Sequence, residues 1–444
     1  MLDTVTSARA LMGMSLSFHI VFTAIGIGVP LFFLLAEGIA LRTGDKTYTL
    51  LARQWGRTAA VLFAIGAVSG TILSFEFGLL WPTWMDFSGA IIGLPFALEG
   101  FAFFTEAIFL ALYLYGWDRL SPKAHWLCAV VVAISAAASA FFVISANSWM
   151  NQPTGFEVVN GKATNVDPIA AIFNPAMPYE VTHGTMASYV ATSFAIAGIY
   201  AIQMLRGNRS EYVKKGFILG MAVGAIATPL QIISGDFSAR FLAHNQPEKF
   251  AAMEAQFETQ RGAPLRIGGI PDPDAKKTRY AIEIPKMASF LAFEDFNAEV
   301  RGVNSFPQDE IPDVRKVHFP FQAMVGIGFF LLFISGWFWV LAWRRKRIAP
   351  GRWMLLAIAA AAPMGFIAIE MGWYVTEFGR QPWIIWHLMR TSEAATPRDG
   401  IFFIFMVFFL VYIALAAGLA LLLLRVTRQP LQAGSALQGL PDVT

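Results

Sequence analysis

Long apolar runs that contain no Asp, Glu, Lys or Arg dominate the sequence. They occupy residues 10–36, 58–75, 124–156, 181–205, 216–235, 317–343 and 400–424. Two further apolar stretches, 87–117 and 353–376, are interrupted only by carboxylates. Because about 20 apolar residues cross the hydrocarbon core of a bilayer, the pattern predicts nine transmembrane helices. No small-residue cleavage site follows the first run, so we expect it to remain as a mature helix.

The composition supports an all-α, polytopic membrane protein. Hydrophobic residues make up 56% and charged residues 14% of the 444 residues, and the mean hydropathy is +0.55. So few charges cannot cover a soluble protein of this size, and we expect membrane lipid, not nucleic acid, as the surrounding partner. The single cysteine, Cys128, excludes a disulfide and covalent haem attachment. Any haem must therefore be held by His, Met, Glu or Tyr side chains.

Basic residues are concentrated in the connections on one side of the predicted helices. Only Lys162, Arg380, Arg390 and Arg398 lie in the short connections on the other side. By the positive-inside rule, the N-terminus is outside and the C-terminus is cytoplasmic. The 17 basic residues of the cytoplasmic side are Arg42, Lys46, Arg53, Arg57, Arg119, Lys123, Arg206, Arg209, Lys214, Lys215, Arg344, Arg345, Lys346, Arg347, Arg352, Arg425 and Arg428.

This topology divides the chain into four parts. Residues 1–240 hold the first six helices, 241–317 form an outer segment, 318–428 hold the last three helices, and 429–444 form a cytoplasmic tail. The outer segment is too long for a simple connector and is typical of a functional loop.

Local signals in the outer connections predict one short helix and several turns. Pro247 opens the helix, with Phe250, Met253 and Phe257 at i, i+3 and i+7 on one face. The rest of the segment reads as turns through Gly268-Gly269 and Pro271. An Asn160-Gly161 turn is expected in the outer connection before the fifth helix.

Two of the six histidines, His19 and His183, fall within the apolar runs. A titratable ring inside a membrane helix is costly and marks a functional candidate; a histidine that bonds a neighbouring helix is the alternative. In the predicted topology, His183 and Met324 begin their helices at the outer side, at the same depth. A His/Met pair can fill both axial positions of a low-spin haem iron, although a methionine taken alone is more often a packing residue.

Glu99 and Glu106 lie seven residues apart within one apolar stretch. Seven residues turn a helix through about 700°, which leaves the two carboxylates within about 20° of each other and about 10.5 Å apart. Two buried carboxylates stacked in this way suit a proton relay. The alternative is a kinked or capped helix with solvated ends.

Glu370 and Glu377 repeat the seven-residue spacing near the outer end of the eighth helix. Trp373 and Arg380 flank Glu377. The carboxylate and the arginine could form an interfacial ion pair within an aromatic belt, or they could supply a haem ligand and an anchor for a haem propionate.

Taken together and in this order, these motifs resemble the cytochrome bd quinol oxidase subunit I family. The resemblance spans the whole chain, and the last motif is the most specific. The motifs are Ser17-Phe18-His19, Glu99-Gly100, Phe103-Phe104-Thr105-Glu106, Gly116-Trp117-Asp118-Arg119, Asn147-Ser148-Trp149-Met150, His183, Met324-Val325-Gly326, and the Gly-Trp…Glu-x-Gly-Arg-Gln-Pro-Trp stretch at 372–383.

The resemblance implies a role for each candidate. His183 and Met324 would be axial ligands of a low-spin haem b, while His19 and Glu377 would each serve one high-spin haem of the oxygen site. Trp373 and Arg380 would line the haem site, and Glu99 and Glu106 would conduct protons. In the outer segment, Lys249 and Glu254 match residues linked to quinol binding. Five residues turn a regular helix through about 140°, so one surface could not easily present both side chains unless the helix is irregular.

The sequence departs from the family pattern at two points. Many members carry Arg where this chain has Gln322, and the outer segment is the short form, which resembles the cyanide-insensitive branch. We therefore expect two haems b with one haem d, or three haems b if haem d is absent. Ubiquinol or menaquinol would be the substrate, and a subunit II of homologous fold and a small single-helix subunit would be partners.

The predicted function is a terminal oxidase subunit in the bacterial inner membrane that oxidises quinol at the outer face. Oxygen would be reduced to water with cytoplasmic protons, so charge separation conserves energy. One alternative is a membrane haem-b quinone oxidoreductase without oxygen chemistry, which needs more membrane histidines. The other is an ion-coupled transporter, which needs inverted repeats.

Overall fold

The computed structural model describes residues 2–346, 348 and 350–428, so the predicted tail at 429–444 lies outside the described residues. Within that part of the chain, nine helical spans are long and apolar enough to cross a membrane, as predicted. They are α1 (Thr4–Thr43), α2 (Lys46–Leu80), α3 (Pro82–Tyr115), α4 (Pro122–Asn151), α6 (Met177–Leu205), α7 (Glu211–Asn245), α10 (Val314–Arg345), the pair α11 (Arg352–Ala361) and α12 (Met364–Arg380), and α14 (Ile401–Arg428).

Local chemistry explains several of the helix ends. The Asp3 carboxylate accepts a hydrogen bond from the Thr6 N–H at 2.9 Å and so caps the start of α1. Gly44, with φ of 70°, ends α1 in the left-handed conformation that glycine adopts without strain. Pro363 separates α11 from α12, because proline lacks the N–H that a continuous helix requires.

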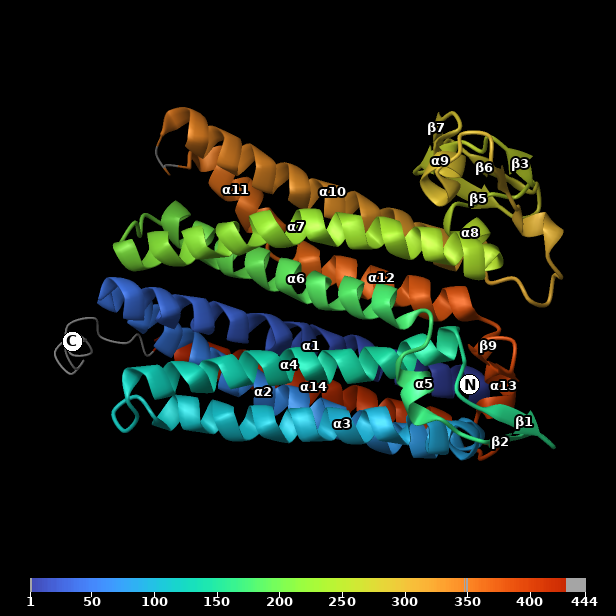
Figure 1. The fold of residues 1–444 in the computed structure, drawn as a ribbon, viewed down its shortest axis with the longest axis horizontal. Coiled ribbons are helices and arrows are strands. Elements are labelled where there is room, and N and C mark those ends of the chain that lie inside the picture. The colour runs from blue at the N-terminus through green and yellow to red at the C-terminus, as the bar shows by residue number, and fades with distance from the viewer. Residues whose placement is uncertain (1, 347, 349, 429–444) are drawn as a thin grey trace.

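The helices pack mainly as neighbouring antiparallel pairs (Figure 1): α1 with α2, α3 with α4, and α6 with α7. Helix α12 packs against both α10 and α6, and α1 contacts α4, α6 and α14. Because α1 contacts α6 as well as α4 and α14, residues of α1 can face a space bounded by α6 and α12.

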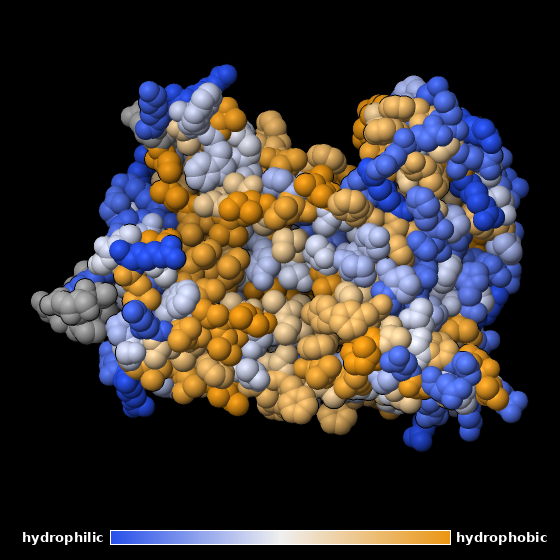
Figure 2. Space-filling view, in the orientation of Figure 1, coloured by the Kyte–Doolittle hydropathy of each residue, from blue (hydrophilic) through white to orange (hydrophobic). Residues whose placement is uncertain are grey.

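The two ends of this bundle differ in structure (Figure 1). One end, here called the turn end, carries the short connections after α1, α3, α6 and α10. The other, called the loop end, carries the start of α1 and every short helix and strand. Figure 2 shows polar residues at both ends and an apolar band between them. The loop-end elements are α5 (Pro168–Ile172), α8 (Pro247–Met253), α9 (Met287–Phe293), the 3-10 helix η1 (Val303–Ser305), α13 (Thr391–Ala394) and ten strands.

The strands form five antiparallel pairs. The Asn160-Gly161 turn is confirmed: both residues have positive φ and join β1 to β2. The pairs are β1 (Glu157–Val159) with β2 (Lys162–Thr164), β3 (Gln260–Arg261) with β8 (Glu299–Val300), β4 (Leu265–Ile267) with β7 (Ile282–Ile284), β5 (Ile270–Asp272) with β6 (Lys277–Arg279), and β9 (Trp383–Ile385) with β10 (Met389–Arg390).

The segment 241–317 is more structured than the sequence suggested. The helix at Pro247 is confirmed as α8, although it ends at Met253 and does not reach Phe257. The stretch that was expected to contain only turns holds three strand pairs and α9. Helix α7 also continues to Asn245, beyond the predicted apolar run. Asp236 and Arg240, whose charges end that run, form an ion pair of 2.8 Å one turn apart and so remain within the helix.

Towards the turn end, aromatic side chains fill the space between the helices. We call this region the packed cluster. Phe217 of α7 meets Phe338 of α10 edge to face, with ring centroids 5.4 Å apart, and Phe33 of α1 stacks on Tyr113 of α3 at 4.6 Å. Its largest members are Phe32, Phe33, Trp55, Tyr113, Phe194, Tyr200, Phe217 and Phe338.

Candidate functional site

Between the packed cluster and the loop end lies a cavity of about 1670 Å³. Helices α1, α6, α7, α8, α10 and α12 supply most of its walls. Eight of the ten sequence-predicted site residues line it, and Glu99 and Glu106 do not. The eight are His19, His183, Lys249, Glu254, Met324, Trp373, Glu377 and Arg380.

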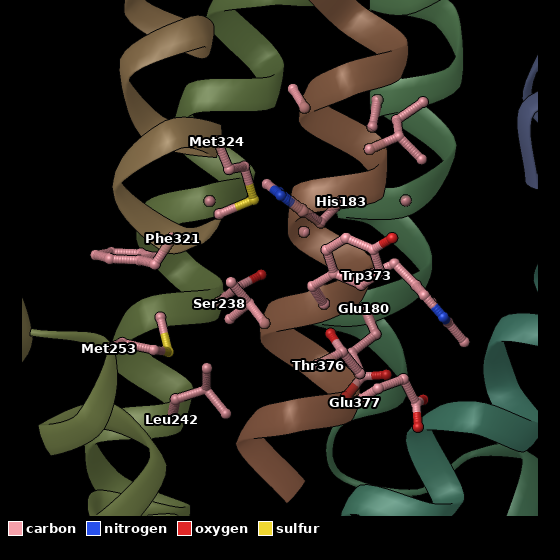
Figure 3. A pocket seen from close by; sticks show the side chains of 18 of the residues that line it. Glu180, His183, Ser238, Leu242, Met253, Phe321, Met324, Trp373, Thr376 and Glu377 are labelled. Carbon is pink, nitrogen blue, oxygen red and sulfur yellow. The ribbon is translucent and has the colours of Figure 1, made fainter. Parts of the chain in front are cut away.

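His183 of α6 and Met324 of α10 face one another across the cavity (Figure 3). The Nδ1 atom of His183 lies 3.0 Å from the Ser234 hydroxyl, and the Gln231 side-chain amide lies 3.1 Å from Nε2. The hydrogen bond at Nδ1 fixes the orientation of the imidazole. For Nε2 to bind a metal ion, the Gln231 amide that approaches it would have to turn aside.

His19 of α1 is held in a similar way. Its Nδ1 atom lies 2.9 Å from the hydroxyl of Ser69 on α2, and its ring lines the cavity. Both candidate histidines therefore combine a serine partner on a neighbouring helix with a ring that reaches the cavity. A histidine that only pins two helices together does not require such a cavity beside it.

Glycine lies against each of these three side chains. A Cβ atom on Gly70 would lie 3.1 Å from the His19 ring, one on Gly235 would lie 3.2 Å from the His183 ring, and one on Gly372 would lie 2.9 Å from the Met324 sulfur. Contacts this short would displace the candidate ligands. The three glycines therefore make room for the observed positions of these side chains.

A buried polar network closes the loop-end side of the cavity. Arg380 is 2% exposed; it donates a 2.5 Å hydrogen bond to Glu377, whose other carboxylate oxygen accepts one from Asn147 at 3.1 Å. Asn151 joins this network through Arg380 and donates to Glu180 at 2.8 Å. The Arg380 Nε atom has no hydrogen-bond partner in the part of the chain that the structure describes, so it remains available to an anion.

Lys249 and Glu254 are both buried at the loop end, with 3% and 7% exposure. Burial lowers the pKa of Lys249 to about 8, although Glu180 opposes this change, and burial raises the pKa of Glu254 to about 7 against the charge of Arg266. The sequence allowed one surface to present both side chains only if the helix was irregular, and the helix ends between them. Helix α8 ends at Met253, so Glu254 lies beyond its last turn and both side chains line the cavity.

Glu99 and Glu106 lie elsewhere, in the interior of α3. The Ser139 hydroxyl of α4 donates a 3.0 Å hydrogen bond to Glu99, and Glu106 is 7% exposed. The two carboxylates interact electrostatically, which agrees with their predicted alignment on one helix face.

Comparison with known proteins identifies the chain. Residues 7–431 match the family model for cytochrome bd terminal oxidase subunit I. The chain belongs to the cytochrome bd terminal oxidase subunit I family.

Relatives cover almost the entire chain. A Bacillus subtilis (strain 168) protein with the provisional name cytochrome bd menaquinol oxidase subunit I is 39% identical over 95% of this chain and 96% of its own length. A cytochrome bd ubiquinol oxidase subunit 1 from the same strain is 33% identical, over 92% of this chain and 90% of its own. The bd oxidase structure from Geobacillus thermodenitrificans has 41% identity and a TM-score of 0.91, covering 96% of this chain and 99% of that one.

Membership of the cytochrome bd family establishes the chain as a multi-pass membrane subunit of a quinol-oxidising terminal oxidase with haem cofactors. It works with quinol, oxygen and a subunit II partner. The residues of the cavity fit haem. They offer histidine, methionine and carboxylate ligands, and glycines that give those ligands space. The buried Arg380 Nε atom, which is unpaired among the described residues, can bind a haem propionate.

The sequence analysis missed several residues of this site. Glu180 precedes His183 by three residues on the same helix and is half-buried, so helical spacing could have identified it. Ser69, Ser234 and Gln231 gave no comparable signal, because hydroxyl and amide side chains are common in membrane helices. Gln322, where many family members carry Arg, bonds the backbone of Arg266 and Gly268 and so ties α10 to the loop end.

Proposed function

We propose that the cavity holds three haems, with His183 and Met324 as the axial ligands of a low-spin haem b. His19 and Glu377 would each ligate one high-spin haem. Two haems b and one haem d are proposed, or three haems b. The single observation that carries this proposal is that all four candidate ligands, from four positions far apart in the sequence, line one cavity.

The chain's own residues account for the geometry that this arrangement requires. Ser69 and Ser234 orient the two imidazoles, and Arg380 supplies a buried positive charge beside Glu377. Oxygen Oε1 of Glu377 accepts one hydrogen bond from Asn147 and keeps a second lone pair for a metal ion. When bound, the haems carry electrons from quinol and reduce oxygen at the high-spin site.

We propose that quinol binds at Lys249 and Glu254. Quinol oxidation releases two electrons and two protons, so its site needs a group that accepts protons near neutral pH. Glu254 fits this role because one of its carboxylate oxygens has no hydrogen-bond partner among the described residues. Lys249, when protonated, would donate a hydrogen bond to a quinol oxygen and hold the ring in place.

The loop end is proposed to face outward, and the turn end the cytoplasm of a bacterium whose inner membrane holds the protein. The 17 basic residues of the turn-end side, against four in the short loop-end connections, support this orientation. Labels at residues 206–210 should then react only from the cytoplasmic side, and labels at 272–277 only from outside. The reversed result would place quinol oxidation on the wrong face.

Protons for water formation are proposed to reach the high-spin site through Glu106 and Glu99. Their stacking on α3 and the hydrogen bond from Ser139 support this route.

A small single-helix subunit is proposed as a further partner. Relatives are named for both menaquinol and ubiquinol, and either quinol fits the proposal.

The pH dependence of quinol oxidation tests the role of Glu254. Because burial raises its pKa to about 7, the accepting carboxylate forms as the pH rises through that value. We therefore expect kcat/KM for quinol to rise across neutral pH, and Glu254→Gln to slow the reaction by about 100-fold or more and to abolish the rise. Oxygen consumption at saturating and limiting quinol measures both effects.

Glu283→Gln is the matched control, because Glu283 also pairs with Arg266 but is exposed at the surface. It should leave the pH profile unchanged. A Glu254→Gln enzyme that kept the rise at full haem content would disprove the quinol-site proposal.

A further inference from the structure

Glu37 and His125 form a buried pair of titratable groups outside the cavity, near the turn end. Nδ1 of His125 on α4 lies 2.7 Å from the Glu37 carboxylate on α1, and the side chains are 3% and 5% exposed. Nε2 of His125 lies 2.8 Å from the backbone carbonyl of Tyr113 on α3. The pair therefore links three helices within the packed cluster.

The geometry fixes where protons are bound. A carbonyl oxygen only accepts, so Nε2 of His125 must carry a hydrogen. If Nδ1 and the carboxylate oxygen were both unprotonated, two lone pairs would face each other at 2.7 Å, so one proton must lie between them. The pair is thus a neutral unit with one shared proton, held away from solvent.

One position in the pair remains open to a second proton. The other carboxylate oxygen of Glu37 is buried and has no hydrogen-bond partner among the described residues, and the same holds for the Tyr113 hydroxyl. That hydroxyl approaches the Glu37 carboxylate closely enough to act on it as a hydrogen-bonding group, and it also interacts with Arg53. The free oxygen of Glu37 and the Tyr113 hydroxyl are therefore neighbours, so a second proton on the carboxylate would lie next to a group that can pass it on.

The His125 side of the pair adjoins a polar surface pocket through Trp117. Arg53, Arg57, Trp117, Asp118 and Arg119 line a hollow of about 260 Å³ at the turn end. The Trp117 ring in its wall contacts the His125 ring, with centroids 4.0 Å apart and the rings tilted by 41°, and the Arg53 guanidinium lies 4.7 Å from the Trp117 ring centroid. The buried pair is thus separated from the pocket by a single layer of side chains.

Tyr113 also continues the proposed proton route. It follows Glu106 by seven residues on α3, as Glu106 follows Glu99. By helix geometry each step of seven keeps the side chains within about 20° of one face and advances about 10.5 Å, a gap that a short water chain can bridge. Along α3, the line of Glu99, Glu106 and Tyr113 thus runs from the contact between Ser139 and Glu99 towards the turn-end pocket.

We propose that the Glu37–His125 pair is the proton-loading station through which cytoplasmic protons reach Glu106. The proposal rests on the proton route and the orientation given under the proposed function. A proton from water in the turn-end pocket adds to the free oxygen of Glu37, while the shared proton moves to His125. The pair then releases one proton past the Tyr113 hydroxyl to Glu106 and returns to its single shared proton.

Glu37→Gln tests this role in the enzyme assembled with subunit II. The glutamine amide can donate to Nδ1 of His125, so both hydrogen bonds of the histidine persist while the titrating group is lost. We expect quinol-dependent oxygen consumption to fall by about tenfold or more, with unchanged haem content and unchanged anaerobic reduction of the haems by quinol. Glu37→Asp, which keeps a carboxylic acid, should recover most of the rate.

Asp45→Asn is the matched control, since it removes a turn-end carboxylate that pairs with Lys215 instead of facing the pocket. It should turn over at the wild-type rate. If Glu37→Gln fails to assemble, His125→Gln decides the question by the same measurements. Wild-type turnover in an assembled variant would overturn the proposal.

Glu106→Gln, measured in parallel, distinguishes failure of the loading station from failure of the proton route. Slow turnover of Glu106→Gln with normal turnover of Glu37→Gln would keep the route and reject this loading station. Normal turnover of both variants at full haem content would reject the proposed route itself. The proposal expects slow turnover of both Glu106→Gln and Glu37→Gln. At position 37, Glu37→Asp should recover most of the rate.

Discussion

The same helices behave differently at their two ends. Towards the turn end, α7 and α10 contribute Phe217 and Phe338, which pack edge to face in the packed cluster. Towards the loop end, α7 contributes Gln231 and Gly235 and α10 contributes Met324, and these line the cavity. One half of each helix thus holds the bundle together, and the other half leaves space and polar groups for a prosthetic group.

The difference concerns what stabilises each half. In the packed cluster, apolar side chains fill the space between helices, and this contact needs no further component. In the cavity, the Arg380 Nε atom and one oxygen each of Glu254 and Gln231 have no partner among the described residues. The packed cluster also contains a Glu37 oxygen and the Tyr113 hydroxyl without a partner among the described residues, but these two groups adjoin each other between packed side chains. In the cavity half the unpaired groups surround a volume of about 1670 Å³. The cavity half should therefore depend on haem for its order, and the packed half should not.

Haem depletion should produce the largest effect and is the most direct way to break this comparison. In protein produced without haem, we expect amide hydrogen exchange to rise strongly in 180–190 and 228–242 but only slightly in 194–204 and 213–221. Mass spectrometry of the two states measures both pairs of segments on the same helices, α6 and α7. Equal loss of protection along these helices would show that the packed half also needs haem.

Truncation in the packed cluster should have the next largest effect. Phe217 is 1% exposed, so Phe217→Ala should lower the free energy of unfolding by about 3–5 kcal/mol through lost contacts and a residual cavity. Phe333→Ala, at a side chain of α10 that is 63% exposed and does not line the cavity, is the control and should change stability little. Denaturant-induced unfolding of the assembled enzyme distinguishes them. Equal stability of the two variants would contradict tight packing at Phe217.

The glycine contacts give a smaller but more specific effect. A Cβ on Gly372 would lie 2.9 Å from the Met324 sulfur, so Gly372→Ala should shift the low-spin haem spectrum and potential without loss of the helix bundle. Gly336→Ala, on the same helix as Met324, would add a Cβ that meets no atom within 4 Å in the described residues. It should leave the spectrum unchanged, and identical spectra for both variants would argue against Met324 as a ligand.

Sequence periodicity was sufficient for the parts of the structure that depend on one helix at a time. The apolar runs predicted all nine spans, and the spacing of Glu99 and Glu106 predicted their common face. Depth in the membrane also brought His183 and Met324 to the same level, because the topology alone fixes where each helix begins. The family resemblance then supplied roles that the residues alone left open.

Features that depend on contacts between helices could not be read in this way. Glu37 and His125 are 88 residues apart, and only the packing of α1 on α4 brings them together. The strand pairs of the segment 241–317 were missed because each strand has only two or three residues, too few to show an alternating pattern. The end of α8 at Met253 was also missed, because the apolar spacing continues to Phe257.

The central claim is that the cavity binds a low-spin haem between His183 and Met324. The optical spectrum of the reduced, assembled enzyme tests it most directly, with His183→Ala and Met324→Ala compared to the unchanged protein. We predict that each variant folds and keeps the high-spin haem signals but loses the low-spin ferrous signal. A normal low-spin spectrum in either variant would contradict the claim.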